Sequence, residues 1–228
     1  MSIGNRLAQT SGALRPAAAA LLAAALLGGC SLLGGGKEPV TVYAPDPRVA
    51  PDPAWPRVAW QLEVAPPEVS RSTDTQRIAV RPGPDELQVY KGVRWAKPPS
   101  EQVEDTVVHA LEDSGRIAGV GRVGNGLAAD YRLAMDVRRF EADYAGNAAP
   151  AATIEVSAKL LHTTDQELVA TRTFVQAVPA GGTATAHVAQ AFSQALGTIA
   201  HDIAGWTLAS GEAHARRAPA PSAGSGGR

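Results

Sequence analysis

The sequence has very little cysteine and almost no net charge, and each shortage excludes a class of protein. Cys30 is the one cysteine among 228 residues, so no disulfide can form within the chain. The formal net charge is −1 at pH 7, which gives no electrostatic footprint for nucleic acid. We therefore expect neither a disulfide scaffold nor a nucleic-acid-binding protein.

Motifs typical of enzymes and of cofactor sites are also missing. The sequence has no GxSxG nucleophile elbow and no HExxH zinc motif. Residues 119–124 spell GxGxxG, but a helix is expected before them where a nucleotide-binding fold needs a strand, so a glycine-rich strand or turn is the better interpretation. The histidines lack the spacing of a zinc site; they are His109, His162, His187, His201 and His214. We expect no catalytic residue, no cofactor and no metal.

Long apolar runs are absent as well. Residues 17–27 form an apolar run of eleven, whereas crossing a hydrocarbon core takes about 20 helical residues. Arg6 and Arg15 supply a short positive leader to this run, and Gly28-Gly29-Cys30 follows it. This order is typical of a secretory signal. Residues 1–29 are therefore predicted to be a signal peptide that is removed before Cys30.

The position of the cysteine indicates lipid attachment. Leu27-Gly28-Gly29-Cys30 resembles the lipobox of bacterial lipoproteins, whose cysteine is acylated, with palmitate a typical acyl group. An ordinary secretory signal with an incidental cysteine, or a buried core cysteine, are the alternatives. Several acyl chains would anchor the protein permanently, since each buried methylene contributes about 0.8 kcal/mol. Ser31, in place of Asp, resembles lipoproteins released to the outer membrane, so we expect the periplasmic face of that membrane.

Composition divides the remaining chain into three parts. Residues 30–56 are rich in glycine and proline and are predicted to be a tether. Residues 57–210 are predicted to form one folded domain, long enough to bury a core. Residues 211–228 have little apolar content and are predicted to be a disordered tail.

The domain alternates apolar and polar residues over several short stretches, which predicts strands. These stretches are 58–64, 77–80, 87–95, 117–123, 131–140, 154–160 and 168–178. Apolar residues recur at helical spacing over 100–115 and 184–209; Ser100 is the expected N-cap and Gly115 the expected C-terminal end of the first helix. The predicted fold is a single α+β domain: a mostly antiparallel mixed sheet of about six strands, with two amphipathic helices packed on one face.

One aromatic residue lies where a strand gives way to a helix. Trp95 is followed by Ala96-Lys97-Pro98-Pro99. Trp95 could cap the core, or could form a binding surface with Pro98 and Pro99, because tryptophan is enriched at interfaces. Trp60 and Trp206 lie on apolar stripes, and both are expected in the core.

The order of these segments resembles a known family. The resemblance rests on the lipobox, the proline-rich segment, Arg77-Ile78-Ala79-Val80, Trp95-Ala96-Lys97-Pro98-Pro99, a helix ending near Gly115, and Asp130 to Glu141. This order is similar to that of the ABC-type transport auxiliary lipoproteins, which accompany Mce-type (mammalian cell entry) lipid transport systems. One departure is that Tyr43-Ala44-Pro45 keeps only the tyrosine of the family's usual first strand.

The resemblance implies a non-catalytic accessory component of an envelope system that moves lipids between membranes. The implied partners are an Mce-domain periplasmic protein and, through it, an inner-membrane ABC permease and ATPase. A homo-oligomer is compatible with such a system, although no residue argues for one. The alternative is an envelope-assembly or envelope-integrity lipoprotein that binds another outer-membrane protein or lipopolysaccharide.

Overall fold

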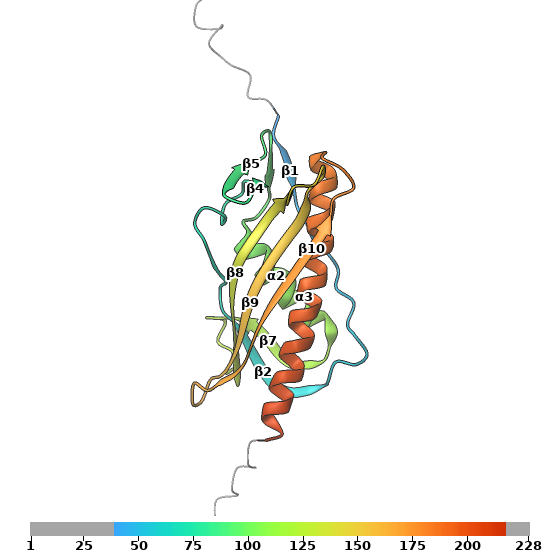
Figure 1. Ribbon diagram of the computed structural model, residues 1–228. Coiled ribbons are helices and arrows are strands. Elements are labelled where there is room, and N and C mark those ends of the chain that lie inside the picture. Colours follow the sequence, from blue (N-terminus) through green and yellow to red (C-terminus); the bar gives the residue numbers. More distant parts are fainter. Residues whose placement is uncertain (1–38, 218–228) are drawn as a thin grey trace, which may run out of the picture. The chain divides into compact units, whose positions relative to one another are not determined.

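Residues 39–217 are described by the computed structural model (Figure 1). Cys30, the predicted signal peptide and the first part of the predicted tether lie outside the described residues, as does the tail from residue 218 onward. Within 39–217 no helix combines the length and the apolarity needed to cross a membrane.

Five strands follow one another across the main sheet in the order β10-β9-β8-β2-β7 (Figure 1). Their bounds are β2 Val58–Val64, β7 Ile117–Arg122, β8 Tyr131–Asp143, β9 Ala151–His162 and β10 Leu168–Pro179. Strands β8, β9 and β10 form the antiparallel meander that the alternating residues predict. Strand β2 lies parallel to both β7 and β8, so the sheet is mixed.

Short strands raise the number in this sheet to eight, against the six expected. They are β3 (Glu68–Val69), β4 (Ala79–Gly83) and β5 (Glu86–Val89). Strand β8 has thirteen residues, which is long enough for β2, β3 and β4 to pair with it one after another. Strand β5 then pairs with β4 as a hairpin. The α+β class is as predicted. Strands β4 and β5 overlap the predicted stretches 77–80 and 87–95, whereas β3 has only two residues and is too short to show a periodicity.

Helix α2 (Pro99–Ser114) begins without a side-chain cap of its own. Pro98 occupies the N-cap position, and the Ser100 backbone N–H donates to Asp74 Oδ1 at 3.1 Å. The predicted capping role of Ser100 is therefore wrong, because a carboxylate from a distant loop takes that role. Gly115 ends the helix with a φ of 57°, as expected for a glycine C-cap.

Helix α3 (Thr185–Ala215) is longer than the pattern predicts. The Tyr131 hydroxyl donates to the Gly211 carbonyl at 3.3 Å and shares a 2.9 Å hydrogen bond with His214 Nδ1. Residues 211–215, assigned to a disordered tail from their composition, are therefore helical. Their contacts come from β8, eighty residues earlier in the chain, and no local pattern shows such contacts.

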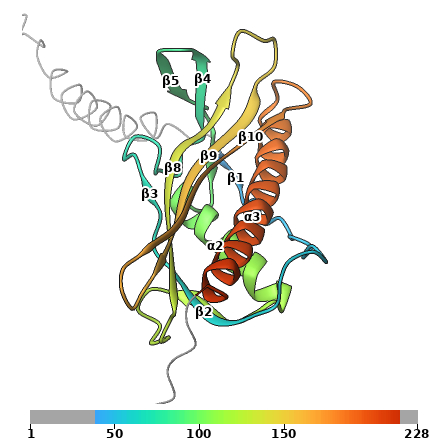
Figure 2. The same cartoon turned by 60° about the horizontal axis from the view of Figure 1, so that its bottom comes forward.

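Both helices lie on the same face of the sheet, as predicted (Figure 2). Phe192 of α3 is fully buried, with its ring stacked 4.9 Å from that of Phe140 on β8. Trp95 contacts Phe192 edge-on at 5.1 Å. The opposite face of β8 and β9 carries charged residues such as Arg132, Asp136 and Glu155, which leaves that face to solvent.

The N-terminal part of the domain differs most from the prediction. Strand β1 (Thr41–Tyr43) pairs in parallel with β6 (Val93–Trp95), apart from the main sheet. Tyr43 OH and Thr185 Oγ1 share a hydrogen bond of 3.0 Å, so β1 is held to the start of α3. We call residues 44–56 the strap. Near the end of the strap, Trp55 is only 7% exposed and contacts His201 of α3 at 4.9 Å between ring centroids.

Three glycines of α3 lie directly against side chains of the strap and of β2. A Cβ atom added at Gly197 would lie 3.1 Å from Pro47 Cβ, and one added at Gly205 would lie 2.5 Å from Trp55 Nε1. At Gly211 the nearest atom would be Trp60 Cζ2, also at 2.5 Å. The assignment of 40–56 to a tether is therefore wrong: this stretch packs on the domain, because the missing side chains of α3 leave room for its proline and tryptophan.

Candidate functional site

A groove runs between the strap and α2. Its deeper part has a volume of about 340 Å³ and is lined by strap residues 44–46, by Ala96 and Lys97, and by Gln102, Asp105, Thr106 and His109 of α2. A second hollow of about 280 Å³ continues it along residues 46–49 toward Asp113. Asp46 and His109 line both hollows. We call this continuous depression the α2 groove.

The predicted interface residues lie at one end of the α2 groove, but they do not form its surface. Trp95 is fully buried against Phe140 and Phe192, so its position agrees with the core alternative. Pro99 is buried and Pro98 is half-buried. The residues that line the groove there are Ala96 and Lys97, between the tryptophan and the prolines. At this end of the groove the lining thus comes from Ala96 and Lys97 and not from Trp95, Pro98 and Pro99, whose interface role stays a prediction.

Ion pairs cover the outer wall of the α2 groove. Lys97 Nζ lies 2.5 Å from Asp105 Oδ2, and Arg122 at the end of β7 bonds the other carboxylate oxygen. Burial raises the pKa of the Asp105 carboxyl, but the hydrogen bonds from Lys97 and Arg122 outweigh it, and the pKa lies below its ordinary value. Asp105 is therefore a fixed carboxylate at neutral pH. Lys97 is more than half exposed, so this pair contributes little to stability.

A buried amide forms part of the wall. Gln102 is 4% exposed, and its Nε2 donates to the Lys97 carbonyl at 2.7 Å. Its Oε1 has no hydrogen-bond partner within residues 39–217. Asp46, Lys97, Asp105 and His109 add charged and polar groups to the deeper hollow, which nevertheless presents more apolar than polar surface, whereas the second hollow is mostly polar. A polypeptide could match both parts of the groove, with apolar side chains in the deeper hollow and polar groups along the second.

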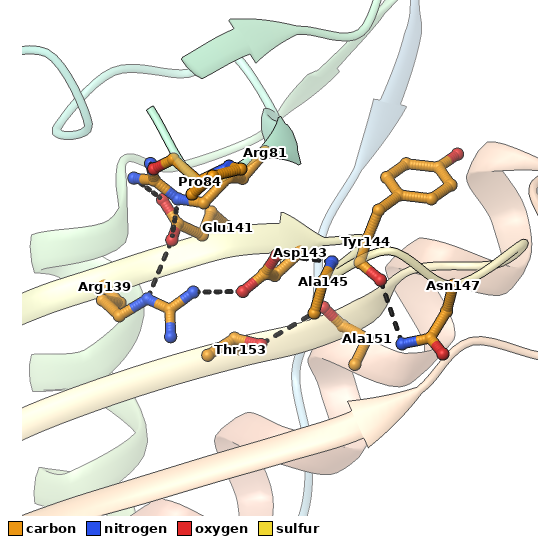
Figure 3. Close-up of polar contacts among 10 residues, drawn as sticks. All are labelled: Arg81, Pro84, Arg139, Glu141, Asp143, Tyr144, Ala145, Asn147, Ala151 and Thr153. Carbon is orange, nitrogen blue, oxygen red and sulfur yellow. Dashed lines mark hydrogen bonds and ion pairs between the residues drawn. The ribbon is translucent and has the colours of Figure 1, made fainter. Parts of the chain in front are cut away.

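A second polar cluster joins β4 to β8 (Figure 3). Glu141 is 3% exposed and accepts hydrogen bonds from Arg81 at 2.8 and 3.0 Å and from Arg139 at 2.8 Å. Arg139 also bonds Asp143. Burial raises the pKa of Glu141, but the two guanidinium groups outweigh it, and the pKa is lowered. A carboxylate with its oxygens occupied in this way is suited to holding two strands together rather than to transferring protons.

The histidines come together only at the far end of α3. His162 and His214 have ring centroids 5.1 Å apart, and His162 Nδ1 lies 2.9 Å from Asp165 Oδ1. His214 is held by the Tyr131 hydroxyl. Among the described residues, no three His, Cys, Asp or Glu side chains are grouped as a metal ion would need. The GxGxxG stretch runs along β7 into a turn, as expected, with no helix after it.

Comparison with known proteins agrees with this fold. A crystal structure of a protein from Xanthomonas campestris is 55% identical in sequence, with a TM-score of 0.76, and the match covers 78% of this chain and 99% of that one. A second crystal structure, of an uncharacterized protein, is 18% identical with a TM-score of 0.58, covering 73% of this chain and 97% of that one, and shows likeness of fold alone. No curated protein matches the chain.

A family model matches residues 41–204, and its description is ABC-type transport auxiliary lipoprotein component. The match begins at the first residue of β1 and ends within α3, so it includes the strap as well as the sheet. It covers well over half of the sequence. This chain belongs to the family of ABC-type transport auxiliary lipoprotein components.

Proposed function

We propose that this chain is a non-catalytic adaptor of an Mce-type ABC system for lipid transport, anchored by lipid on Cys30 to the periplasmic face of the outer membrane. The observation that carries the proposal is the family match over residues 41–204, which include all the strands and most of α3. The lipobox-like residues Leu27-Gly28-Gly29-Cys30 lie outside that match and are the basis for proposing the lipid on Cys30 as the anchor. The fixed carboxylates of both polar clusters support a binding role rather than a catalytic one.

The start of the fold sets how far the domain reaches from its anchor. Nine residues separate Cys30 from Val40, at the start of the domain. Fully extended, this stretch spans at most about 35 Å, against about 95 Å if residues 31–56 were all tether. The domain is therefore held close to the membrane. A partner has to extend across the periplasm to meet it, as an Mce-domain protein linked to an inner-membrane permease would do.

The α2 groove is the surface that we propose for this partner. Its lining alternates in charge, with Asp46, Asp105 and Asp113 near Lys97 and Arg48. Such a surface favours correct pairing and fast association with a complementary protein surface. It also begins beside residues 95–99, for which the sequence leaves an interface open as one of two alternatives.

Site-specific photo-cross-linking in cells tests this proposal. A photoreactive residue in place of Lys97 is expected to form an adduct with an Mce-domain protein. The matched control is the same residue in place of Lys159, which is exposed on the open face of β9. Both sites keep the lipidated full chain, and the Lys97–Asp105 pair that is lost is exposed and weak.

The adducts distinguish the candidate functions. An Mce-domain protein recovered from position 97 and not from position 159 supports the transport adaptor. Recovery of an outer-membrane assembly protein or of lipopolysaccharide from position 97, with no Mce-domain protein, overturns it in favour of the envelope-assembly alternative.

A further inference from the structure

Strand β10 forms an open edge of the main sheet. It pairs with β9 on one side, and within residues 39–217 no strand pairs with its other side (Figure 1). It has twelve residues. A long edge strand presents a row of unpaired backbone groups, and proteins usually block such an edge with charge, proline or a bulge. An edge of this length left unblocked is a template for another strand.

The hydrogen-bond register shows which residues face outward. The Ala180 backbone N–H donates to the Pro150 carbonyl at 2.9 Å, and these two residues lie directly opposite in the register that also pairs Pro179 with Ala151. Bonded and non-bonded pairs alternate along antiparallel strands. The even-numbered residues of β10 therefore bond β9. The odd-numbered residues Thr171, Thr173, Val175 and Ala177 direct their backbone groups to the open edge.

The same odd-numbered residues also have exposed side chains on the solvent face of the sheet, and Val175 is 54% exposed. The devices that block an edge lie only at the two ends of β10: a bulge between Leu168 and Ala170, and Pro179. Between them the one charged residue is Arg172. Its guanidinium lies over the Phe174 ring at 4.9 Å, and within 39–217 no carboxylate pairs with it.

We propose that the open edge binds a second copy of this chain, with the two β10 strands antiparallel about a two-fold axis at Phe174. This register places Thr171 opposite the partner's Ala177 and Thr173 opposite the partner's Val175. The outward backbone groups of both strands then bond each other. These cross-strand pairs are uncharged and rich in β-branched residues, which suits a sheet.

Charge complementarity argues for a second copy over an unrelated strand. The register places Arg172 opposite the partner's Gln176, so the two arginines do not meet. In each chain Gln176 Nε2 donates to Asp202 Oδ2 at 3.2 Å, and Asp202 is about 41% exposed. Arg172 of each copy therefore comes beside the Asp202 carboxylate of the other. A hollow of about 390 Å³ beside the edge, lined by Arg172, Asp202 and Trp206 among others, receives this contact.

Disulfide cross-linking of the full-length lipoprotein in membranes tests the register. Two differently tagged chains, Thr173→Cys and Val175→Cys, are co-produced and oxidised. Directly opposite residues come close enough for a disulfide, whereas diagonal residues are about 7–8 Å apart. We expect the mixed disulfide to exceed either self-disulfide by at least about tenfold. The wild-type chain, with Cys30 alone, is the control for dimers formed through that residue.

A charge at the edge tests the interface without cysteine. Val175→Lys brings a positive charge beside its partner's edge and should weaken dimerisation at least about tenfold, or 1.4 kcal/mol. Val123→Lys is the matched control, since Val123 is 46% exposed on the loop after β7. Native mass spectrometry in detergent measures the dimer fraction. The proposal is overturned if the wild-type chain is monomeric and the mixed disulfide does not form. It is also overturned if both lysine variants lose the same fraction of dimer, or if the β10 edge cross-links only to a different protein.

Discussion

Two neighbouring stretches of the N-terminal region, residues 31–39 and 40–56, share the prediction of a tether but differ in composition. Residues 31–39 hold three glycines and one proline, whereas residues 40–56 hold five prolines and no glycine. The second stretch begins with a strand paired to β6 and ends with a buried tryptophan on α3. Proline-rich sequence thus does not distinguish a linker from a strap, because proline also suits an extended chain that packs through its rings.

The strap packs against a surface of α3 that is distant in the sequence. Gly197 and Gly205 stand in α3, about 150 residues after the strap residues that they receive. An isolated glycine inside a helical pattern normally weakens the helix by about 1 kcal/mol. Because Gly197 and Gly205 have no side chains, Pro47 and Trp55 can pack directly against the helix backbone.

Removing the buried tryptophan should have the largest effect. Trp55→Ala is expected to destabilise the domain by about 3–5 kcal/mol, the range for large aromatic truncations in a core. Leu33→Ala is the matched truncation in the stretch still predicted to be tether, and it should leave the free energy of unfolding unchanged. Urea denaturation of both variants measures the two values. Equal, small effects would mean that the strap does not belong to the folded domain.

Substitution of one glycine of α3 by alanine should lower the stability of the domain, the opposite of its usual effect in a helix. Gly→Ala in a helix normally stabilises by about 0.5–1 kcal/mol. At Gly205 the added Cβ would overlap the Trp55 indole, so Gly205→Ala should instead destabilise by about 1–3 kcal/mol. In the Trp55→Ala background the same substitution should become neutral or stabilising. A double-mutant cycle by thermal denaturation gives this coupling, and additive effects would contradict the packing described here.

Acid should unfold the sheet and the strap together. Since Arg81 and Arg139 lower the pKa of folded Glu141, its contribution to stability is present above the ordinary glutamate pKa of about 4.3 and is lost as pH falls through the folded value. Glu141→Gln should lower stability by about 1–3 kcal/mol at pH 7 and flatten this acid dependence. Circular dichroism and protection of the strap from hydrogen exchange should report one transition. Separate transitions would show that the strap is not part of the cooperative unit.

The sequence predicts the parts of the fold whose signal is local. The meander, the buried face of α3 around Phe192, and the Gly115 end of α2 all follow from periodicity and capping. Long-range features could not be predicted in this way. The Asp74 cap of α2, the docking of Trp55 and the last turn of α3 each depend on residues distant in the chain.

In the candidate site, too, only the features with a local sequence signal could be predicted. Trp95-Ala96-Lys97-Pro98-Pro99 marks one end of the α2 groove, since an aromatic residue and two prolines at a strand–helix junction are visible in sequence. Asp46 and His109 could not be assigned to it, because they meet only when the strap crosses α2. The orientation of Trp95 could not be predicted either, since core and interface tryptophans have the same local pattern.

Limited trypsin digestion of the membrane-bound lipoprotein tests the central claim most directly. This claim is that the folded domain begins near residue 40 and includes the strap, so that only the short stretch after Cys30 is tether. Lys37 and Arg48 are the tryptic sites between Cys30 and Trp55. We predict rapid cleavage after Lys37, which releases a domain whose first residue is Glu38, while Arg48 is spared because Pro47 and Trp55 hold the strap on α3. In Trp55→Ala, cleavage after Arg48 should become fast. Release of a fragment beginning at Val49 from the wild-type chain, as fast as cleavage after Lys37, would contradict the account.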